Sequence, residues 1–392
     1  MHLPGFFAMA TAIASTFFLP TSAATTEELV GDFIDMATDI AGTIFPQPNP
    51  ATKVELVGDL ITMSDDGFYP RVLVLEDSTI LAGYSSKRGA IVRPSHDNGK
   101  TWGEETIVLA PHPPPNKTED FNNVFLYQLP NKNILCTYRR HIRTPDKKRI
   151  LELNIEVYQS TDGGKTWGFL SSIYHDVRKE GAIGVWEPFL RMDMDGKLEV
   201  YWSFEKSPKN QDSVKRVSKD NGKTWGPILT ELTGGGLEAR DGMVGIVAQD
   251  KANKDLLMVL ETNVKNPMKV WALDSTTGGG KWGNRRIIFD PTSEKHPKKQ
   301  AGGPAIVKVN GTMVVSFMTD QDAPTGDAYP NYKEGVHMKV ITSGDDGKTW
   351  GEATTAIKNA SWGAVTVVGD EVMVVGAQYL TGKAVAQKII IR

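Results

Sequence analysis

The sequence predicts an all-β protein, a six-bladed β-propeller with a short helix ahead of it. The main observation is a nine-residue motif, S-x-D-x-G-K-T-W-G, which begins at Ser95, Ser160, Ser218 and Ser343. A fifth copy at residues 274–283 keeps Lys-Trp-Gly but carries Thr-Thr-Gly-Gly-Gly before it. Self-similarity of this kind indicates a repeat architecture, so the fold is sought among repeat proteins.

The spacing of the copies favours blades over helical repeats. The five motif tryptophans follow one another at intervals of 57 to 68 residues, which suits a four-stranded blade with generous loops. Within each copy, Asp accepts hydrogen bonds from nearby backbone, Gly takes a positive φ and Trp packs between sheets. The motif therefore predicts a tight structural hairpin, and its Asp is not expected to be catalytic.

Short apolar segments separated by Gly, Asp and Asn fill the intervals and predict strands. Five full units and a short last one can be aligned, and they span residues 69–102, 122–167, 186–225, 241–282, 303–350 and 364–375. A strand around residues 54–57 is expected to complete the last unit, which closes the ring and removes free sheet edges. We expect one catalytic domain over residues 51–392.

The N-terminal region indicates secretion. Residues 1–23 are mostly apolar and end in small residues suitable for cleavage, which predicts a signal peptide. Residues 24–50 are predicted as a helical extension, because a capping box precedes apolar residues at helical spacing. Three glycosylation sequons, at Asn116, Asn310 and Asn359, fit an extracellular location.

Composition excludes several function classes. The net charge is -3 with acidic and basic residues interspersed, which argues against nucleic acid or a membrane surface as a partner. A single cysteine, Cys136, rules out an internal disulfide framework. The seven histidines show no pair at metal-ligand spacing, so no catalytic metal or other cofactor is expected. We expect a monomer with a neutral or weakly charged partner.

Propeller geometry predicts where functional residues lie. The innermost strand of a blade starts, and the second strand ends, at the same mouth of the central channel. Residues at first-strand starts are Arg71, Asn122, Asn123, Glu187 and Asp241. Residues at second-strand ends are Tyr84, Arg139, Arg140, Glu205, Glu261, Asp320 and Tyr379.

Two carboxylates stand out within this set. Glu187 is flanked by bulky apolar residues, and Glu261 terminates an apolar strand. Apolar neighbours raise the pKa of a carboxyl group, while a nearby arginine keeps a second one ionised. Such a pair is what glycoside hydrolysis requires. Glu205, beside Lys206, and Glu238, in a glycine-rich loop, are weaker candidates; the alternative without catalysis is a carbohydrate-binding propeller with solvated or ion-paired acids.

The repeated motif resembles the Asp-box of sialidase-like six-bladed propellers, from about residue 54 to the end of the chain. An exo-sialidase is therefore an alternative reading, and it requires three arginines around the substrate carboxylate. Tyr69-Pro70-Arg71 stands where the first arginine motif belongs, with Pro and Arg in reversed order. Ser361-Trp362-Gly363 stands where a third arginine is expected, so the triad is not apparent.

A closer resemblance is to the fungal secreted exo-arabinanases of glycoside hydrolase family 93, through the segment Gly-Val-Trp-Glu-Pro at residues 184–188. That resemblance implies release of arabinobiose from the non-reducing end of linear α-1,5-L-arabinan, a plant cell-wall polysaccharide, with retention of configuration. It implies Glu187 as acid/base and Glu261 as nucleophile, with Glu238 as an alternative to the latter. The candidate sugar contacts are Arg71, Asn122, Arg139, Trp186, Asp241 and Tyr379.

Overall fold

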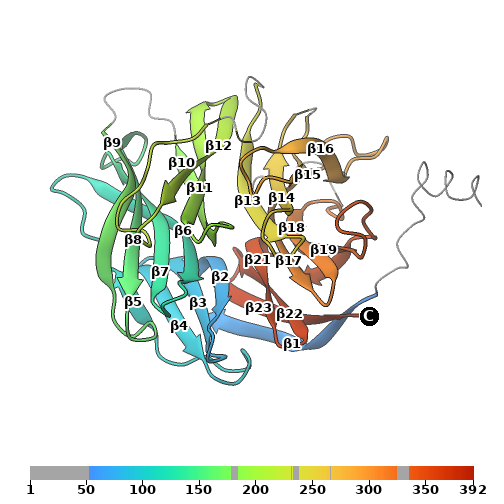
Figure 1. Cartoon of the computed structure of the whole chain (residues 1–392), viewed down its shortest axis with the longest axis horizontal. Coiled ribbons are helices and arrows are strands. Elements are labelled where there is room, and N and C mark those ends of the chain that lie inside the picture. Colours follow the sequence, from blue (N-terminus) through green and yellow to red (C-terminus); the bar gives the residue numbers. More distant parts are fainter. Residues whose placement is uncertain (1–52, 178–183, 231, 233–237, 265, 325–334) are drawn as a thin grey trace, which may run out of the picture. The chain divides into compact units, whose positions relative to one another are not determined.

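The computed structural model describes residues 53–177, 184–230, 232, 238–264, 266–324 and 335–392. Six antiparallel sheets surround a central axis in the manner of propeller blades (Figure 1). The innermost strand of each blade contacts that of the next, and the sixth returns to the first. The predicted six-bladed fold is confirmed. The predicted signal peptide and helical extension lie outside the described residues, which contain no helix.

Each blade runs from its innermost strand outward, in chain order. Blades 1 and 2 consist of β2 (Phe68–Val74), β3 (Ile80–Ser86), β4 (Gly89–Ser95) and β5 (Thr106–Leu109), then β6 (Thr118–Gln128), β7 (Ile134–Arg143), β8 (Ile150–Ser160) and β9 (Gly168–Val177). Blades 3 and 4 consist of β10 (Val185–Met192), β11 (Leu198–Ser207) and β12 (Asn210–Ser218), then β13 (Asp241–Ala248), β14 (Leu256–Thr262), β15 (Lys269–Ser275) and β16 (Gly283–Phe289). Blade 5 consists of β17 (Ala301–Val309), β18 (Thr312–Thr319), β19 (His337–Ser343) and β20 (Thr354–Ile357).

Blade 6 joins the two ends of the propeller. It contains β21 (Ser361–Val368), β22 (Glu371–Gln378) and β23 (Lys383–Ile391), and its outermost strand is β1 (Val54–Ser64) from the other end of the chain. β1 pairs antiparallel with β23 from Val54 opposite Ile391 to Ser64 opposite Ala384. This pairing closes the ring, as the sequence predicts, and gives the last unit its fourth strand.

In blades 1, 2, 4 and 5 the repeated Asp-box forms the turn between the third and fourth strands, and in blade 3 it follows the third strand, β12. In the second copy, Asp162 Oδ1 accepts hydrogen bonds from Ser160 Oγ at 2.8 Å and Thr166 N at 2.9 Å, and Oδ2 accepts one from Thr166 Oγ1 at 2.6 Å. The side-chain and backbone hydrogen bonds of Thr166 lower the pKa of Asp162 to about 2. The aspartate is thus occupied by its own turn, on the outer strands and away from the channel.

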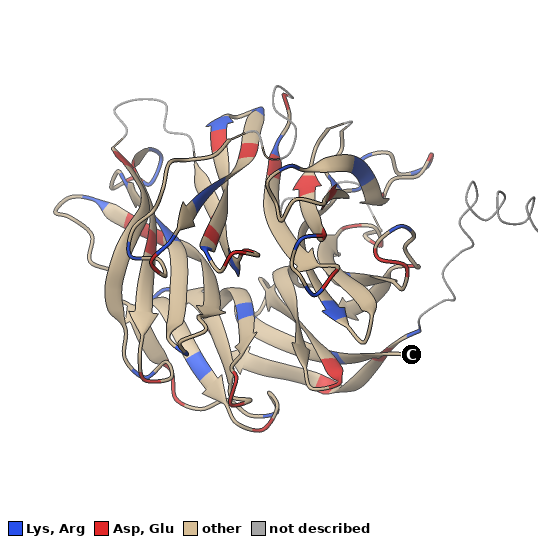
Figure 2. Cartoon of the chain, in the orientation of Figure 1, with Lys and Arg blue, Asp and Glu red and all other residues tan. Residues whose placement is uncertain are grey.

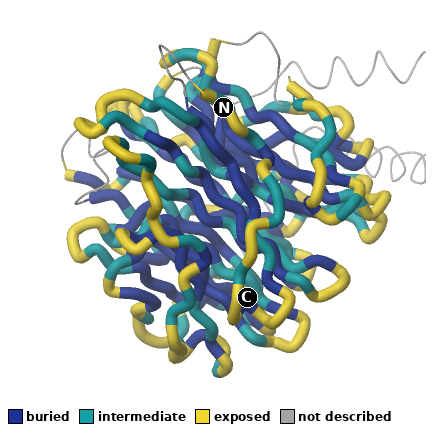
Figure 3. Tube along the Cα trace, turned by 90° about the vertical axis from the view of Figure 1, so that its left-hand side faces the viewer, coloured by how far each residue is buried: buried dark blue, intermediate teal, exposed yellow. Residues whose placement is uncertain are grey.

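Apolar clusters hold neighbouring blades together. Six clusters of buried residues lie in the described part of the chain, and each draws its members from two adjacent blades. Asp-box glycines contribute by close approach: a Cβ on Gly164, whose φ is +91°, would lie 3.3 Å from Leu81 Cδ1 of the preceding blade. Figure 3 shows the strands buried in the interior and the turns exposed at the surface.

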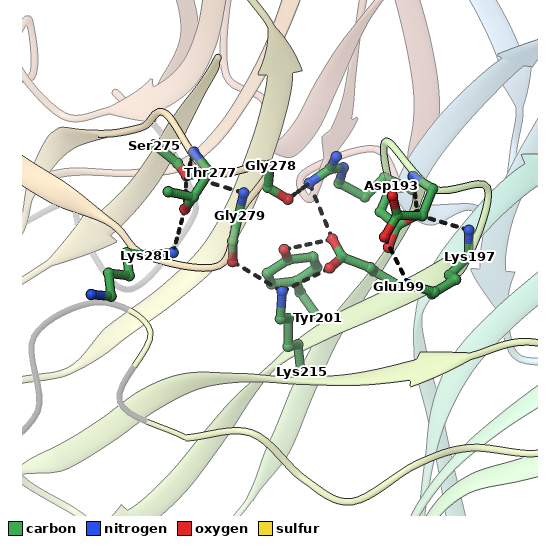
Figure 4. A network of polar contacts seen from close by, with 12 residues as sticks. Asp193, Lys197, Glu199, Tyr201, Lys215, Ser275, Thr277, Gly278, Gly279 and Lys281 are labelled. Atoms are coloured by element: carbon green, nitrogen blue, oxygen red, sulfur yellow. Dashed lines mark hydrogen bonds and ion pairs between the residues drawn. The ribbon is translucent and has the colours of Figure 1, made fainter. Parts of the chain in front are cut away.

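In the degraded Asp-box of blade 4 a threonine replaces the aspartate, and the turn lies against blade 3. Thr277 occupies the Asp position and accepts a hydrogen bond from Lys281 N at 2.8 Å. Figure 4 shows that the backbone of this turn faces a buried charged group of blade 3, where Glu199 lies against Tyr201 and Lys215. Arg191 donates to the carbonyl of Gly278, and Lys215 Nζ donates to that of Gly279 at 3.0 Å. We call Arg191, Glu199, Tyr201 and Lys215 the blade 3 ion cluster.

Basic and acidic residues are intermixed over the turns and strand ends (Figure 2). The residues that the structure describes include no helix long and apolar enough to cross a membrane. Cys136 is fully buried in β7 and has a free thiol, so it packs as a small hydrophobe.

Candidate active site

The innermost strand of every blade carries a β-bulge near its start. Pairing with the second strand shifts register between, for example, Trp186 and Phe189 in blade 3 and Gly242 and Gly245 in blade 4. The same shift occurs in the other four blades. One residue in each bulge has a φ of 51° to 61°, namely Tyr69, Asn123, Glu187, Met243, Gly303 and Trp362. These six residues form what we call the bulge ring.

Four of the six bulge-ring residues line the candidate site. A positive φ is unfavourable for residues other than glycine and is tolerated where the surrounding structure enforces it. A bulge also re-aims a side chain that would otherwise follow the strand's alternation. Four members of the ring, Tyr69, Asn123, Glu187 and Trp362, line one pocket of about 400 Å³. The pocket is completed by Asn122, Arg139, Trp186, Gln211, Arg240, Glu261 and Met268.

Glu187, in the bulge of β10, places its carboxyl group in this pocket. Its Oε2 accepts a hydrogen bond of 2.6 Å from Ser203 Oγ on β11. Removal from bulk water is the main cause that raises the pKa of Glu187, to about 7, and the charge of Glu261 adds to it. Ser203, Arg139 and Arg71 act in the opposite direction. Glu187 is thus suited to hold a proton near neutral pH.

Glu261 is the second carboxyl group and it lies at the end of β14. Burial raises its pKa, but the backbone N–H of Gly303 and the charge of Arg240 lower it. Gly303 N donates to Glu261 Oε2 at 2.7 Å. Glu261 therefore has a fixed donor from the backbone, whereas Glu187 has only a neutral hydroxyl. This difference favours ionisation of Glu261 ahead of Glu187.

Trp186 is held by residues on three sides. Its Nε1 donates to Glu205 Oε2 at 3.1 Å, and the guanidinium carbon of Arg139 lies 4.7 Å from its ring centroid. His141 meets the indole edge-on, with ring centroids 4.9 Å apart. These contacts fix an aromatic ring in the wall of the pocket.

Both arginines of the pocket are engaged with carboxylates. Arg139 Nη1 lies 2.9 Å from Asp120 Oδ2, and its Nε donates to Asn123 Oδ1 at 3.0 Å. Arg240 Nη1 lies 2.6 Å from Glu205 Oε1, and its Nη2 donates to Gln211 Oε1 at 2.9 Å. Each positive charge is balanced locally, so the pocket offers little net attraction for an anion.

Five of the residues proposed from sequence line the pocket: Glu187, Glu261, Asn122, Arg139 and Trp186. The other three do not line this pocket. Asp241 is buried and forms a bidentate ion pair with Arg285, at 2.6 and 2.7 Å. Arg71 stacks 3.7 Å from the centroid of Tyr69 and lines a second cavity of about 300 Å³ along the innermost strands. Tyr379 is 37 % exposed and packs on Phe68.

The weaker candidates also separate. Glu238 is exposed and does not line the pocket. Glu205 does not line it either, but it binds two residues that do, Arg240 and Trp186. Sequence reasoning did not propose Tyr69, Gln211, Met268 or Trp362 as site residues. A signal was present, since Tyr69-Pro70, Glu187-Pro188 and Gly303-Pro304 place a proline directly after a bulge-ring residue in three blades.

Two further predictions concern the surface and metals. Among the sequons, Asn116 and Asn310 are exposed, whereas Asn359 is partly buried and accepts a hydrogen bond from Gly335 N at 3.1 Å. The described residues contain no group of three or more His, Cys, Asp or Glu side chains placed to hold a metal ion.

Comparison with solved structures places the fold among the sialidase-like six-bladed propellers. The structure is similar to the GH93 α-L-arabinofuranosidase of Fusarium graminearum in complex with arabinobiose, with a TM-score of 0.63 and 20 % identity over 88 % of this chain and 98 % of that one. It is also similar to an α-L-arabinanase of Penicillium chrysogenum complexed with arabinobiose, with a TM-score of 0.61 and 21 % identity over the same shares.

A sialidase of Streptococcus pneumoniae shares the fold at a TM-score of 0.56 and 11 % identity, over 95 % of this chain and 73 % of that one. No family model matches the chain, and no curated protein matches it in sequence. The comparisons therefore identify the fold, and the function is argued from the site.

Proposed function

We propose that this protein is a glycoside hydrolase in which Glu187 and Glu261 perform the chemistry. The observation that carries the proposal is the pair of carboxyl groups in one pocket with different surroundings. The pKa of Glu187 is raised to about 7, and Glu261 accepts a backbone hydrogen bond from Gly303. Two carboxyl groups whose environments separate their protonation states are what acid and nucleophile roles require.

In the proposed reaction, Glu187 gives its proton to the oxygen of the scissile glycosidic bond as that bond breaks. Glu261 attacks the anomeric carbon and forms a covalent glycosyl-enzyme. Glu187, now ionised, takes a proton from water, and the resulting hydroxide displaces Glu261 from the sugar. Configuration is retained because two displacements occur.

For the substrate we propose linear α-1,5-L-arabinan, with arabinobiose released from the non-reducing end. The similarity to the Fusarium and Penicillium structures, both complexed with arabinobiose, supports this choice. So does the pocket, because Trp186 and Trp362 supply aromatic surface and its arginines are neutralised. An uncharged sugar needs no further cation.

Sialidase activity is less well supported. A sialoside carboxylate requires converging arginines, and the pocket contains Arg139 and Arg240, each paired with an acidic side chain. We also propose that the protein is secreted and glycosylated, because its N-terminus is apolar and the sequons at Asn116 and Asn310 are exposed.

The test is product analysis with purified protein on linear arabinan, arabino-oligosaccharides and a sialoside, with Glu187→Gln and Glu261→Gln in parallel. Arabinobiose as the only early product, lost in both variants, would establish the proposal, and NMR of the nascent anomer would report retention. Release of sialic acid would assign the sialidase reaction instead. Absence of product from every glycan would refute hydrolysis.

A further inference from the structure

Among the residues that the structure describes, Ser203 is the one whose hydroxyl hydrogen-bonds to the proposed acid, Glu187. It lies on β11 and is 2 % exposed, with its Oγ 2.6 Å from Glu187 Oε2 and 3.1 Å from the backbone N of Met243. We propose that Ser203 is a positioning residue that holds the proton of Glu187 on Oε1. This inference rests on the proposed acid role of Glu187.

The donors and acceptors around Ser203 support this position of the Glu187 proton. Met243 N–H can only donate, so Ser203 Oγ accepts from it. Among the described residues, the hydroxyl hydrogen has one acceptor, Glu187 Oε2. A proton on Oε2 would either weaken that oxygen as the acceptor of the serine hydrogen or point at the same hydroxyl and leave that hydrogen buried without a partner, and both are unfavourable. The described residues give Oε1 no hydrogen bond, so the proton resides there.

The backbone of blade 4 makes this contact possible. Gly242 precedes the bulge-ring residue Met243, and a Cβ at Gly242 would lie 2.9 Å from Ser203 Oγ and 2.4 Å from Gln211 Nε2. Real Cβ atoms do not approach other atoms so closely, so a side chain here would displace the hydroxyl. The backbone of the blade 4 bulge thus fixes the hydroxyl of Ser203, and this hydroxyl orients the carboxyl group of Glu187.

Other charged groups around Glu187 do not replace this hydrogen bond. Glu261 raises the pKa of Glu187, while Arg139 and Arg71 lower it by charge rather than by contact. Tyr69 lies in the same pocket and its own pKa is raised by burial, so it stays neutral. Removal of the Ser203 hydroxyl therefore tests the effect of its hydrogen bond to Glu187 separately from the effects of nearby charges.

The experiment is a titration of the Glu187 carboxyl group by ¹³C NMR in glutamate-labelled full-length protein, with Glu187→Gln to assign the signal. Ser203→Ala is compared with Ser213→Ala. Ser213 is the matched control, because it pairs with Ser203 across β11 and β12 and is fully buried, and the described part of the chain gives its Oγ no hydrogen-bond partner. Circular dichroism checks that both variants fold.

Loss of the hydroxyl is expected to raise the pKa of Glu187 by about one unit in Ser203→Ala and to leave it unchanged in Ser213→Ala. The alkaline limb of kcat/KM should move upward with it, and kcat should fall by roughly tenfold, a part of the 10²–10⁴-fold that a positioned acid contributes. An unmoved pKa in Ser203→Ala, or equal shifts in both variants, would overturn the inference. Failure of the proposed function is distinguishable, since the wild type would then hydrolyse no glycan whatever the titration shows.

Discussion

Glu261, at the end of the second strand of blade 4, accepts a 2.7 Å hydrogen bond from the backbone N–H of Gly303, a bulge-ring residue of blade 5. The donor belongs to the backbone, so it cannot rotate away or change its charge. It stabilises the ionised form of Glu261 next to a second carboxyl group that lacks such a donor. The division of roles that we propose for the two glutamates thus depends on contact between neighbouring blades.

The first prediction concerns the pH dependence of hydrolysis. The proposed mechanism requires protonated Glu187 and ionised Glu261, so kcat/KM should fall about tenfold per pH unit above the Glu187 pKa of about 7. The acidic limb should lie above pH 4.5, because burial raises the pKa of Glu261 above that value. Initial rates on an arabino-oligosaccharide across pH 3 to 9 measure both limbs. A rate that stays constant to pH 9 would exclude Glu187 as the acid.

The second prediction concerns stability and Glu187. Its pKa is raised by folding, so the folded state binds more protons between pH 4.5 and about 7, and stability is lost as pH rises through that window. The loss amounts to roughly 3 kcal/mol when complete. Glu187→Gln should therefore be more stable than the wild type at pH 8 and similar to it at pH 4, measured by urea unfolding. The control Glu104→Gln, at an exposed position, should show no such difference.

A third prediction tests the blade 3 ion cluster. Glu199 accepts from Lys215 Nζ at 2.7 Å and Tyr201 at 2.8 Å, and it pairs with Arg191 at 3.1 Å. Glu199→Gln leaves two buried cations without their anion and should cost about 3–5 kcal/mol of unfolding free energy. The exposed pair of Asp195 with Lys197 serves for comparison, and Asp195→Asn should cost less than about 1 kcal/mol. Equal losses in urea unfolding would contradict the special role of the cluster.

The fourth prediction compares an intact Asp-box with the degraded one. Asp220 accepts three hydrogen bonds, from Ser218 Oγ, Thr224 N and Thr224 Oγ1, whereas Thr277 Oγ1 accepts one from Lys281 N and shares a longer one of 3.3 Å with Ser275 Oγ. Asp220→Ala should lower the melting temperature more than Thr277→Ala, with no change in kcat. Hydrogen bonds of Thr224 lower the pKa of Asp220 to about 2, so its stabilising effect should disappear as pH falls from about 4 to 2. Calorimetry at pH 7 and pH 2.5 gives the comparison.

The fifth prediction separates two aromatic residues. Trp362 lines the pocket, whereas Tyr379 packs on Phe68 outside it. Trp362→Ala should raise KM for an arabino-oligosaccharide by roughly 2- to 10-fold through lost aromatic contact, while Tyr379→Ala should leave KM unchanged. An effect confined to Tyr379→Ala would move the sugar-binding surface to the rim between blades 1 and 6.

Much of this molecule could be predicted from local patterns. The Asp-box turn is made by residues within one nine-residue stretch, so its sequence alone specifies the hairpin and, by repetition, the blades. Glu187 and Glu261 could be selected because strand ends of consecutive blades converge on one mouth of the channel. Both line the pocket. These inferences depend on chain direction and periodicity, which a sequence displays directly.

The remaining features required the tertiary structure. Asp241 starts a first strand, as Glu187 nearly does, yet its carboxylate is taken by Arg285, 44 residues further along the chain. Tyr69 and Trp362 reach the pocket through bulges whose positive φ redirects a side chain, and only at Tyr69 does a following proline mark the bulge in the sequence. The sequence by itself determined the blades and their closure, and it pointed to two glutamates that line the pocket. Tertiary structure decided the surroundings of each carboxyl group, because the backbone N–H on Glu261 and the hydroxyl on Glu187 come from strands that meet only in the folded chain.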